Sequence, residues 1–129
     1  LDMGDFHRLF DEGLALARSK MGQEHTLFID GLPVKSPSTP LIDLSPIDTS
    51  VVLGKFASAT AEHVDLAAAA ARRAQKAWAK KPWQERLQIL RKAANVIRDR
   101  KYEIGAVMSL EVGKSRLEAM GDICIVAYM

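Results

Sequence analysis

The chain contains 129 residues, of which 48% are hydrophobic and 26% are charged, and its formal net charge is +2 at pH 7. These fractions are close to the globular average, which excludes a wholly disordered or collagen-like chain. No apolar run approaches the ~20 residues that cross a bilayer, and no basic segment followed by an apolar stretch marks a secretory signal, so we expect no membrane association and a cytoplasmic location.

Residues 1–25 are predicted to contain an amphipathic helix. Apolar side chains recur there at helical spacing: Phe6, Leu9, Phe10, Leu14 and Ala17. Asp5 directly precedes the first residue of this stripe, and an aspartate accepts hydrogen bonds from the free N–H groups at a helix start. We therefore expect Asp5 to cap the helix.

Residues 26–59 are predicted to form two β-hairpins. Asp30-Gly31 separates two short apolar runs, and an Asp-Gly pair favours a type I′ turn because both central residues need positive φ. Pro33 in the return arm indicates an edge strand, because proline donates no ladder hydrogen bond. The second hairpin is predicted to pair residues 41–44 with residues 51–56 across a Ser-Pro turn.

Residues 60–129 are predicted to form three or four helices, because the hydrophobic period changes near Thr60 from about 2 to about 3.6. The first helix carries an alanine-rich stripe that predicts close contact with a neighbouring element: Val64, Ala67, Ala68, Ala71, Ala74 and Trp78. Pro82 is predicted to begin the next helix. A third helix is predicted to end at Gly113, and its inward-facing residues are expected to be Ile104, Val107 and Met108. Ser115 and Glu118 fit the capping box of the fourth. The fold class predicted for the chain is α+β.

Positive charge gathers between Arg72 and Lys101, where eleven basic side chains accompany two acidic ones. A surface for nucleic acid or for an acidic partner would show this bias. The solvated face of two amphipathic helices would show it too, and we prefer that interpretation, so we expect no nucleic-acid partner. A non-enzymatic binding module remains the alternative function, and it predicts binding that weakens steeply with salt.

Few residues offer chemistry by themselves. The histidines at positions 7, 25 and 63 are scattered, without the spacing of a zinc site. Cys124 lies between Ile123 and Ile125, an apolar setting that predicts a buried and unreactive thiol. The Gly-Lys-Ser run at 113–115 lacks the upstream glycine and preceding strand of a phosphate-binding loop. The residues alone therefore assign no catalytic or cofactor-binding group.

The order of the segments is more informative than any single motif. It combines an early hairpin with these runs: Leu41 to Lys55, Ala77-Trp78, Pro82-Trp83-x-Glu85-Arg86, Leu110-Glu111-Val112-Gly113-Lys114 and Glu118-Ala119. From about Leu27 to Asp122 this order resembles the N-terminal part of the aldehyde dehydrogenase superfamily. The helical leader, residues 5–22, resembles what precedes the hairpin in the 1-pyrroline-5-carboxylate dehydrogenase branch.

The resemblance implies the N-terminal portion of an α/β fold, in which residues 26–59 form an oligomerisation flap and residues 60–129 the helical part of an incomplete dinucleotide-binding domain. The parent protein would be a homo-oligomer that uses NAD or NADP to oxidise an aldehyde to a carboxylate. Glutamate semialdehyde (1-pyrroline-5-carboxylate) is the expected substrate, with aliphatic or succinyl semialdehydes next. The family's nucleophilic cysteine, catalytic glutamate and glycine-rich segment lie downstream, so we expect this segment alone to be inactive.

One difference from the family and one further similarity to it concern particular residues. Residues 121–129 are apolar where the family's helix continues amphipathic, and we expect this tail to expose apolar surface. Glu111 matches a family position that helps bind a structural monovalent cation, and the backbone carbonyls of Asp43 and Leu44 match the positions that complete the site. The alternative is that Glu111 is simply a solvated or arginine-paired carboxylate.

Overall fold

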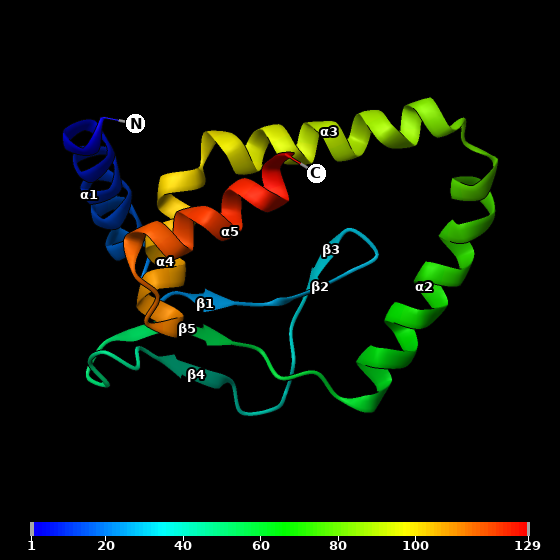
Figure 1. Ribbon diagram of the computed structural model, residues 1–129. Helices are drawn as coiled ribbons and strands as arrows, with labels where there is room; N and C mark the ends of the chain where they lie inside the picture. The colour runs from blue at the N-terminus through cyan, green and yellow to red at the C-terminus, as the bar shows by residue number, and fades with distance from the viewer. Residues whose placement is uncertain (1, 129) are drawn as a thin grey trace.

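The computed structural model describes residues 2–128 and arranges them in five α-helices and five short β-strands (Figure 1). In chain order the elements are α1 (Met3–Ser19), β1 (Glu24–His25), β2 (Leu27–Ile29), β3 (Leu32–Val34), β4 (Leu41–Leu44), β5 (Val52–Phe56), α2 (Ala61–Lys80), α3 (Trp83–Asp99), α4 (Lys101–Val112) and α5 (Arg116–Tyr128). The predicted α+β class is confirmed. No helix within the described residues is both long and apolar enough to cross a membrane.

Helix α1 begins one turn earlier than its predicted cap. The side chain of Asp2 accepts hydrogen bonds from the backbone N–H groups of Gly4, at 2.8 Å, and Asp5, at 3.2 Å. The prediction that Asp5 caps the helix was therefore wrong. Asp5 lies in the first turn, where its negative charge is favourable beside the positive end of the helix dipole and pairs with Arg8 at 3.1 Å.

Both predicted hairpins form, but they belong to different sheets. Strands β2 and β3 pair antiparallel around a turn in which Asp30 (φ 54°) and Gly31 (φ 77°) both have positive φ. Strands β4 and β5 pair antiparallel in a three-stranded sheet of order β1-β5-β4, where β1 runs parallel to β5. The sequence did not predict β1, because two residues carry no periodicity.

The predicted starts of α2 and α5 and the predicted end of α4 are confirmed by local geometry. The backbone N–H of Thr60 donates to His63 Nδ1 at 3.0 Å as α2 begins. Gly113 ends α4 with φ 72°, the left-handed conformation expected of a C-terminal glycine. The capping box of α5 forms, because the N–H of Ser115 donates to Glu118 Oε2 at 3.0 Å.

The hydrophobic core lies where α1 packs against α4 and α5, helices that are more than 80 residues away in the sequence (Figure 1). Six apolar side chains are buried in it: Phe6, Phe10, Ala17, Ala106, Met120 and Ile123. Gly13 allows α1 to approach α4 closely, since a Cβ atom at this position would lie 2.6 Å from the backbone carbonyl of Tyr102. The core therefore depends on a small residue at the helix crossing.

Helix α2 is mostly exposed, and the close contact predicted for its alanine stripe was wrong. Ala70 is the one buried residue of α2, while Val64 is 61% exposed and Trp78 is 39% exposed. Figure 1 shows α2 (green) apart from the core helices, and its main neighbour is β2. Alanine spacing predicts an apolar face, but within residues 2–128 little chain is placed to cover it.

Two further predictions of burial need correction. Ile104 and Met108 of α4 pack against the core as expected, but Val107 is 41% exposed. Cys124 is exposed, because its neighbour Ile123 occupies the inward position of α5 and one residue turns the helix by about 100°.

The predicted exposure of the apolar tail is confirmed for Ile125 and Val126, which are 60% and 59% exposed. The side chains of residues 127–128 and the whole of Met129 lie outside what the structure describes.

Candidate cation site

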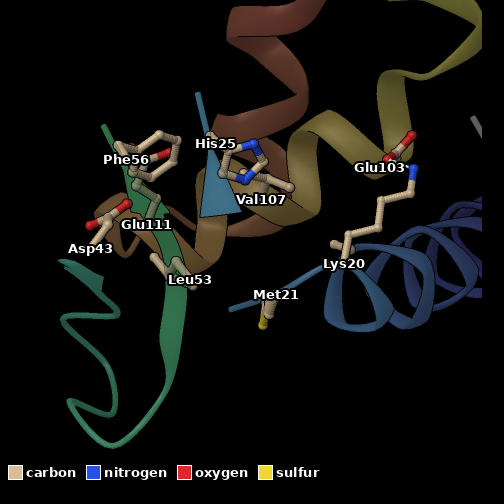
Figure 2. A pocket seen from close by; sticks show the side chains of 10 residues that line it. Lys20, Met21, His25, Asp43, Leu53, Phe56, Glu103, Val107 and Glu111 are labelled. Atoms are coloured by element: carbon tan, nitrogen blue, oxygen red, sulfur yellow. Dashed lines mark hydrogen bonds and ion pairs between the residues drawn. The ribbon is translucent and has the colours of Figure 1, made fainter. Parts of the chain in front are cut away.

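A cavity of about 250 Å³ lies between the end of α1, helix α4 and the three-stranded sheet (Figure 2). Its apolar wall includes Leu53, Phe56 and Val107. Its polar lining is richer in acid than in base: Lys20, His25, Asp43, Glu103 and Glu111. Three elements that are distant in the sequence thus bring charged groups to one place.

Asp43 and Glu111, two of the three residues predicted for a cation site, line this cavity together. Within the described residues neither carboxylate takes part in any of the hydrogen bonds or ion pairs that hold the fold together. The arginine pairing considered as an alternative for Glu111 is therefore not seen in this part of the chain.

Leu44, the third predicted residue, follows Asp43 at the end of β4 and is 43% exposed, but it is not among the residues that line the cavity. Asp43 pairs with Gly54 and Leu44 pairs with Val52, so Leu53 is an extra residue at this point. Such a bulge interrupts the regular ladder and changes the direction of the strand. The backbone irregularity falls between the two residues whose carbonyl oxygens were predicted as ligands.

Glu103 is the buried acid of the cavity, and its charge is already neutralised. Its carboxylate accepts hydrogen bonds from Arg100, at 2.9 and 3.0 Å, and from Lys20, at 2.5 Å. The bond with Arg100, followed by that with Lys20, lowers the pKa of Glu103 from its ordinary 4.5 to about 2. Figure 2 shows Lys20, the residue that follows the end of α1, pointing at Glu103 of α4, so this pair ties the end of α1 to α4.

His25 and Phe56 form an aromatic wall on the sheet side. Their rings stack with centroids 4.8 Å apart and an interplanar angle of 14°. They come from the parallel strands β1 and β5, where His25 is the register partner of Phe56. Sequence reasoning missed both residues, because the only available signal was an isolated histidine beside a short apolar run.

The side chains alone do not make a metal centre. Among the described residues no group of three or more His, Cys, Asp or Glu side chains could hold a metal ion. A monovalent cation needs fewer charged ligands, because backbone carbonyl oxygens complete the coordination of hard ions. The donor set of one carboxylate and two carbonyls therefore suits such an ion better than a transition metal.

The basic stretch does not act as a single unopposed patch. Arg73 pairs with Asp30 at 2.8 Å, and Lys81 pairs with Glu85 at 3.0 Å. Arg100 is engaged by Glu103. Part of the charge between Arg72 and Lys101 thus serves contacts within the chain.

Comparison with known proteins decides the family. The model of the Aldehyde dehydrogenase family matches residues 34–128. The chain belongs to the aldehyde dehydrogenase family. The resemblance drawn from the order of the sequence motifs is thereby confirmed.

Named relatives include members of the 1-pyrroline-5-carboxylate dehydrogenase branch and one protein of another activity. The chain is 36% identical over 113 residues to the 1-pyrroline-5-carboxylate dehydrogenase of Staphylococcus haemolyticus, covering 88% of this chain and 22% of that protein. It is 38% identical over 96 residues to the alpha-ketoglutaric semialdehyde dehydrogenase of Bacillus subtilis, covering 74% of this chain and 20% of that protein. The chain thus spans about a fifth of the curated relatives that it matches.

Solved structures agree with this branch. A Thermus 1-pyrroline-5-carboxylate dehydrogenase with bound NAD matches with a TM-score of 0.89 and 32% identity, covering 95% of this chain and 24% of that one. Because only about 5% of this chain lies outside the match, most of α1 is included, and the similarity extends beyond residues 34–128 matched by the family model.

Proposed function

We propose that the protein carrying this segment is an NAD(P)-dependent dehydrogenase that oxidises glutamate semialdehyde, the open form of 1-pyrroline-5-carboxylate, to a carboxylate. The observation that carries the proposal is the match of nearly the whole chain to an NAD-bound 1-pyrroline-5-carboxylate dehydrogenase. When bound, the nicotinamide would accept the hydride. The described residues offer no glycine-rich strand-to-helix turn, so none of them is assigned to the dinucleotide.

In this proposal the segment supports the fold and takes no part in the chemistry. Its only cysteine, Cys124, lies on an exposed helix face rather than at a substrate cavity. The 129-residue chain, mixed with NAD and glutamate semialdehyde, should give no rise in nicotinamide absorbance, whereas the full-length gene product should. Turnover by the short chain would contradict this division of roles.

A second substrate is favoured by a specific observation, the 38% identity to an alpha-ketoglutaric semialdehyde dehydrogenase. Both aldehydes carry a carboxylate, and they differ in chain substituents. The full-length gene product should show a higher kcat/KM for glutamate semialdehyde than for α-ketoglutaric semialdehyde. The reverse order would assign the protein to the second activity.

We also propose that the protein forms a homo-oligomer in the cytoplasm. Supporting the first part, the β2–β3 hairpin forms an isolated two-stranded sheet with unpaired edges, and Phe28 and Leu32 on it are 73% and 65% exposed. Supporting the second, an exposed lone thiol such as Cys124 persists best in a reducing compartment. Light scattering on the full-length gene product tests the oligomer, and a monodisperse monomer would contradict it.

Finally, we propose that Glu111 and the backbone carbonyls of Asp43 and Leu44 hold a structural monovalent cation. The shared cavity of Asp43 and Glu111 supports this. Replacing Glu111 by Gln should lower the Tm in sodium or potassium chloride and leave it unchanged in choline chloride. Glu24→Gln is the matched control, because Glu24 is exposed on β1 and does not line the same cavity.

A further inference from the structure

Ser45 is a buried polar residue that neither the sequence motifs nor the proposed chemistry uses. It follows the last residue of β4 and is only 1% exposed. Its hydroxyl Oγ donates to the backbone carbonyl of Leu110 at 2.7 Å and accepts from the N–H of Ile47 at 3.3 Å. The hydroxyl therefore acts as donor and acceptor at once.

The carbonyl of Leu110 is one of the last four of α4, which have no partner within the helix. Its neighbour in the same turn, the Ser109 carbonyl, is bonded by the N–H of Gly113 at 3.0 Å. Ser45 provides the corresponding bond for Leu110 from a segment 65 residues away. The end of β4 is thereby fixed to the last turn of α4.

This hydrogen bond joins residues adjacent to both halves of the proposed cation site. Ser45 directly follows Leu44, and Leu110 directly precedes Glu111. The other end of α4 is held by the ion pairs of Glu103 with Lys20 and Arg100. Lys20 thus ties the start of α4 to the end of α1, and Ser45 ties the last turn of α4, next to Glu111, to the end of β4.

We propose that Ser45 is a positioning residue for the cation, because its hydroxyl sets the distance between the Glu111 carboxylate and the carbonyls of Asp43 and Leu44. This inference rests on the proposed cation site. Hydrogen bonds that orient metal ligands without touching the metal commonly change its affinity by 10–100-fold. Loss of the Ser45 hydroxyl should therefore weaken cation binding about tenfold, the lower end of that range.

The test follows the Tm of the full-length gene product as sodium chloride replaces choline chloride at constant ionic strength. The stabilisation by sodium should follow RT ln(1 + [Na⁺]/Kd), and fitting the Tm values to this relation gives the midpoint, the sodium concentration at which half of the native protein is occupied. In Ser45→Ala the midpoint should move to about tenfold higher sodium. Ser58→Ala is the matched control, because Ser58 Oγ also donates to a backbone carbonyl, that of Thr39 at 2.9 Å, but neither Ser58 nor Thr39 is adjacent in sequence to a proposed cation ligand. Its sodium midpoint should equal that of the wild type.

The outcomes separate the two proposals. No sodium response in the wild type overturns the cation site and this inference with it. A response that Glu111→Gln abolishes, combined with an unchanged midpoint in Ser45→Ala, supports the site and overturns the role of Ser45. Should Ser45→Ala not fold, Ser45→Cys provides the same test, because a thiol is similar in size and a weaker donor. Its midpoint must rise, and an unchanged value overturns the inference.

Discussion

Two helical regions of this molecule have similar sequence patterns and different surroundings. Helix α1 and helix α3 are both 17 residues long with apolar residues at helical spacing. In α1 the stripe is covered, and Phe6 and Phe10 are 4% and 2% exposed. In α3 no residue is buried, and Trp83 and Leu90 are 62% and 63% exposed. Amphipathic spacing thus predicts that a helix has an apolar face, but it does not predict which segment covers that face.

The largest effect should separate these two helices directly. Phe10→Ala removes a fully buried ring from the core and should lower the free energy of unfolding of the 129-residue chain by about 3–5 kcal/mol. Trp83→Ala removes an exposed ring and should change it by less than about 0.5 kcal/mol. Urea unfolding of dilute samples measures both. Equal losses would show that α3 is covered within this chain.

The same pair of variants in the full-length gene product sharpens the comparison. If another segment or subunit covers α3 there, Trp83→Ala should become costly while the effect of Phe10→Ala stays the same. A neutral Trp83→Ala in both proteins would mean that this face stays in water.

The next effect concerns the crossing of α1 and α4. Gly13→Ala places a Cβ atom 2.6 Å from the backbone of Tyr102, and backbone cannot move aside as a flexible side chain can. The helices must separate, which should cost about 3 kcal/mol. Gly121→Ala is the matched control on α5, where a Cβ meets nothing within 4 Å. It should stabilise the protein by up to about 1 kcal/mol, because alanine favours a helix interior. The midpoints of urea unfolding of the two variants should therefore shift in opposite directions from that of the wild type.

Glu103→Gln tests the ion pairs of Glu103 with Lys20 and Arg100. It should lower the free energy of unfolding by about 2 kcal/mol at neutral pH, because a buried carboxylate loses its charge-assisted hydrogen bonds. The loss is moderate because both partners are about half exposed. The pKa of Glu103 is lowered in the folded state to about 2, from an ordinary 4.5. Its contribution is therefore complete above about pH 4.5 and is lost as the pH falls toward 2. The difference in Tm between wild type and variant should shrink across that interval. A difference in Tm that does not change with pH would mean that the substitution acts through packing rather than through the charge of Glu103.

The smallest effect should come from the contact between α2 and the hairpin. Arg73 and Asp30 are 64% and 62% exposed, so their ion pair should contribute only about 0.2–1 kcal/mol. Asp30→Asn tests it without disturbing the turn, because asparagine tolerates the positive φ of this position. A double-mutant cycle with Arg73→Ala gives the coupling energy. A value well above 1 kcal/mol would mean that α2 is held more firmly than its exposure suggests.

Local signals predicted most of the fold. The Asp30-Gly31 turn, the glycine at 113 and the Ser115–Glu118 box act over a few residues, so they are readable from the chain alone. The Asp5 cap failed because Asp2 has the same chemistry three residues earlier. The prediction that Cys124 is buried was wrong, because three consecutive apolar residues do not show which of them turns inward.

The candidate site was predictable only in part. The resemblance supplied Asp43, Leu44 and Glu111, whose types suit a hard cation. It did not supply Glu103, whose burial depends on partners in α1 and at the start of α4, or Ser45, whose hydroxyl meets a carbonyl 65 residues away. Such pairings arise from tertiary packing, and no spacing along the chain reports them.

The packing of α1 against α4 and α5 in one core has a consequence for synthesis on the ribosome. Lys20 and Glu103 are 83 residues apart, and Asp11 and Arg116, which also pair, are 105 residues apart. Because translation is vectorial, Phe6 and Phe10 leave the ribosome long before α4 and α5 exist to cover them. The β2–β3 hairpin can close at once, whereas α1 must wait with its apolar face in water until about 100 further residues have emerged. Early chaperone capture of the nascent α1 segment is the expected result.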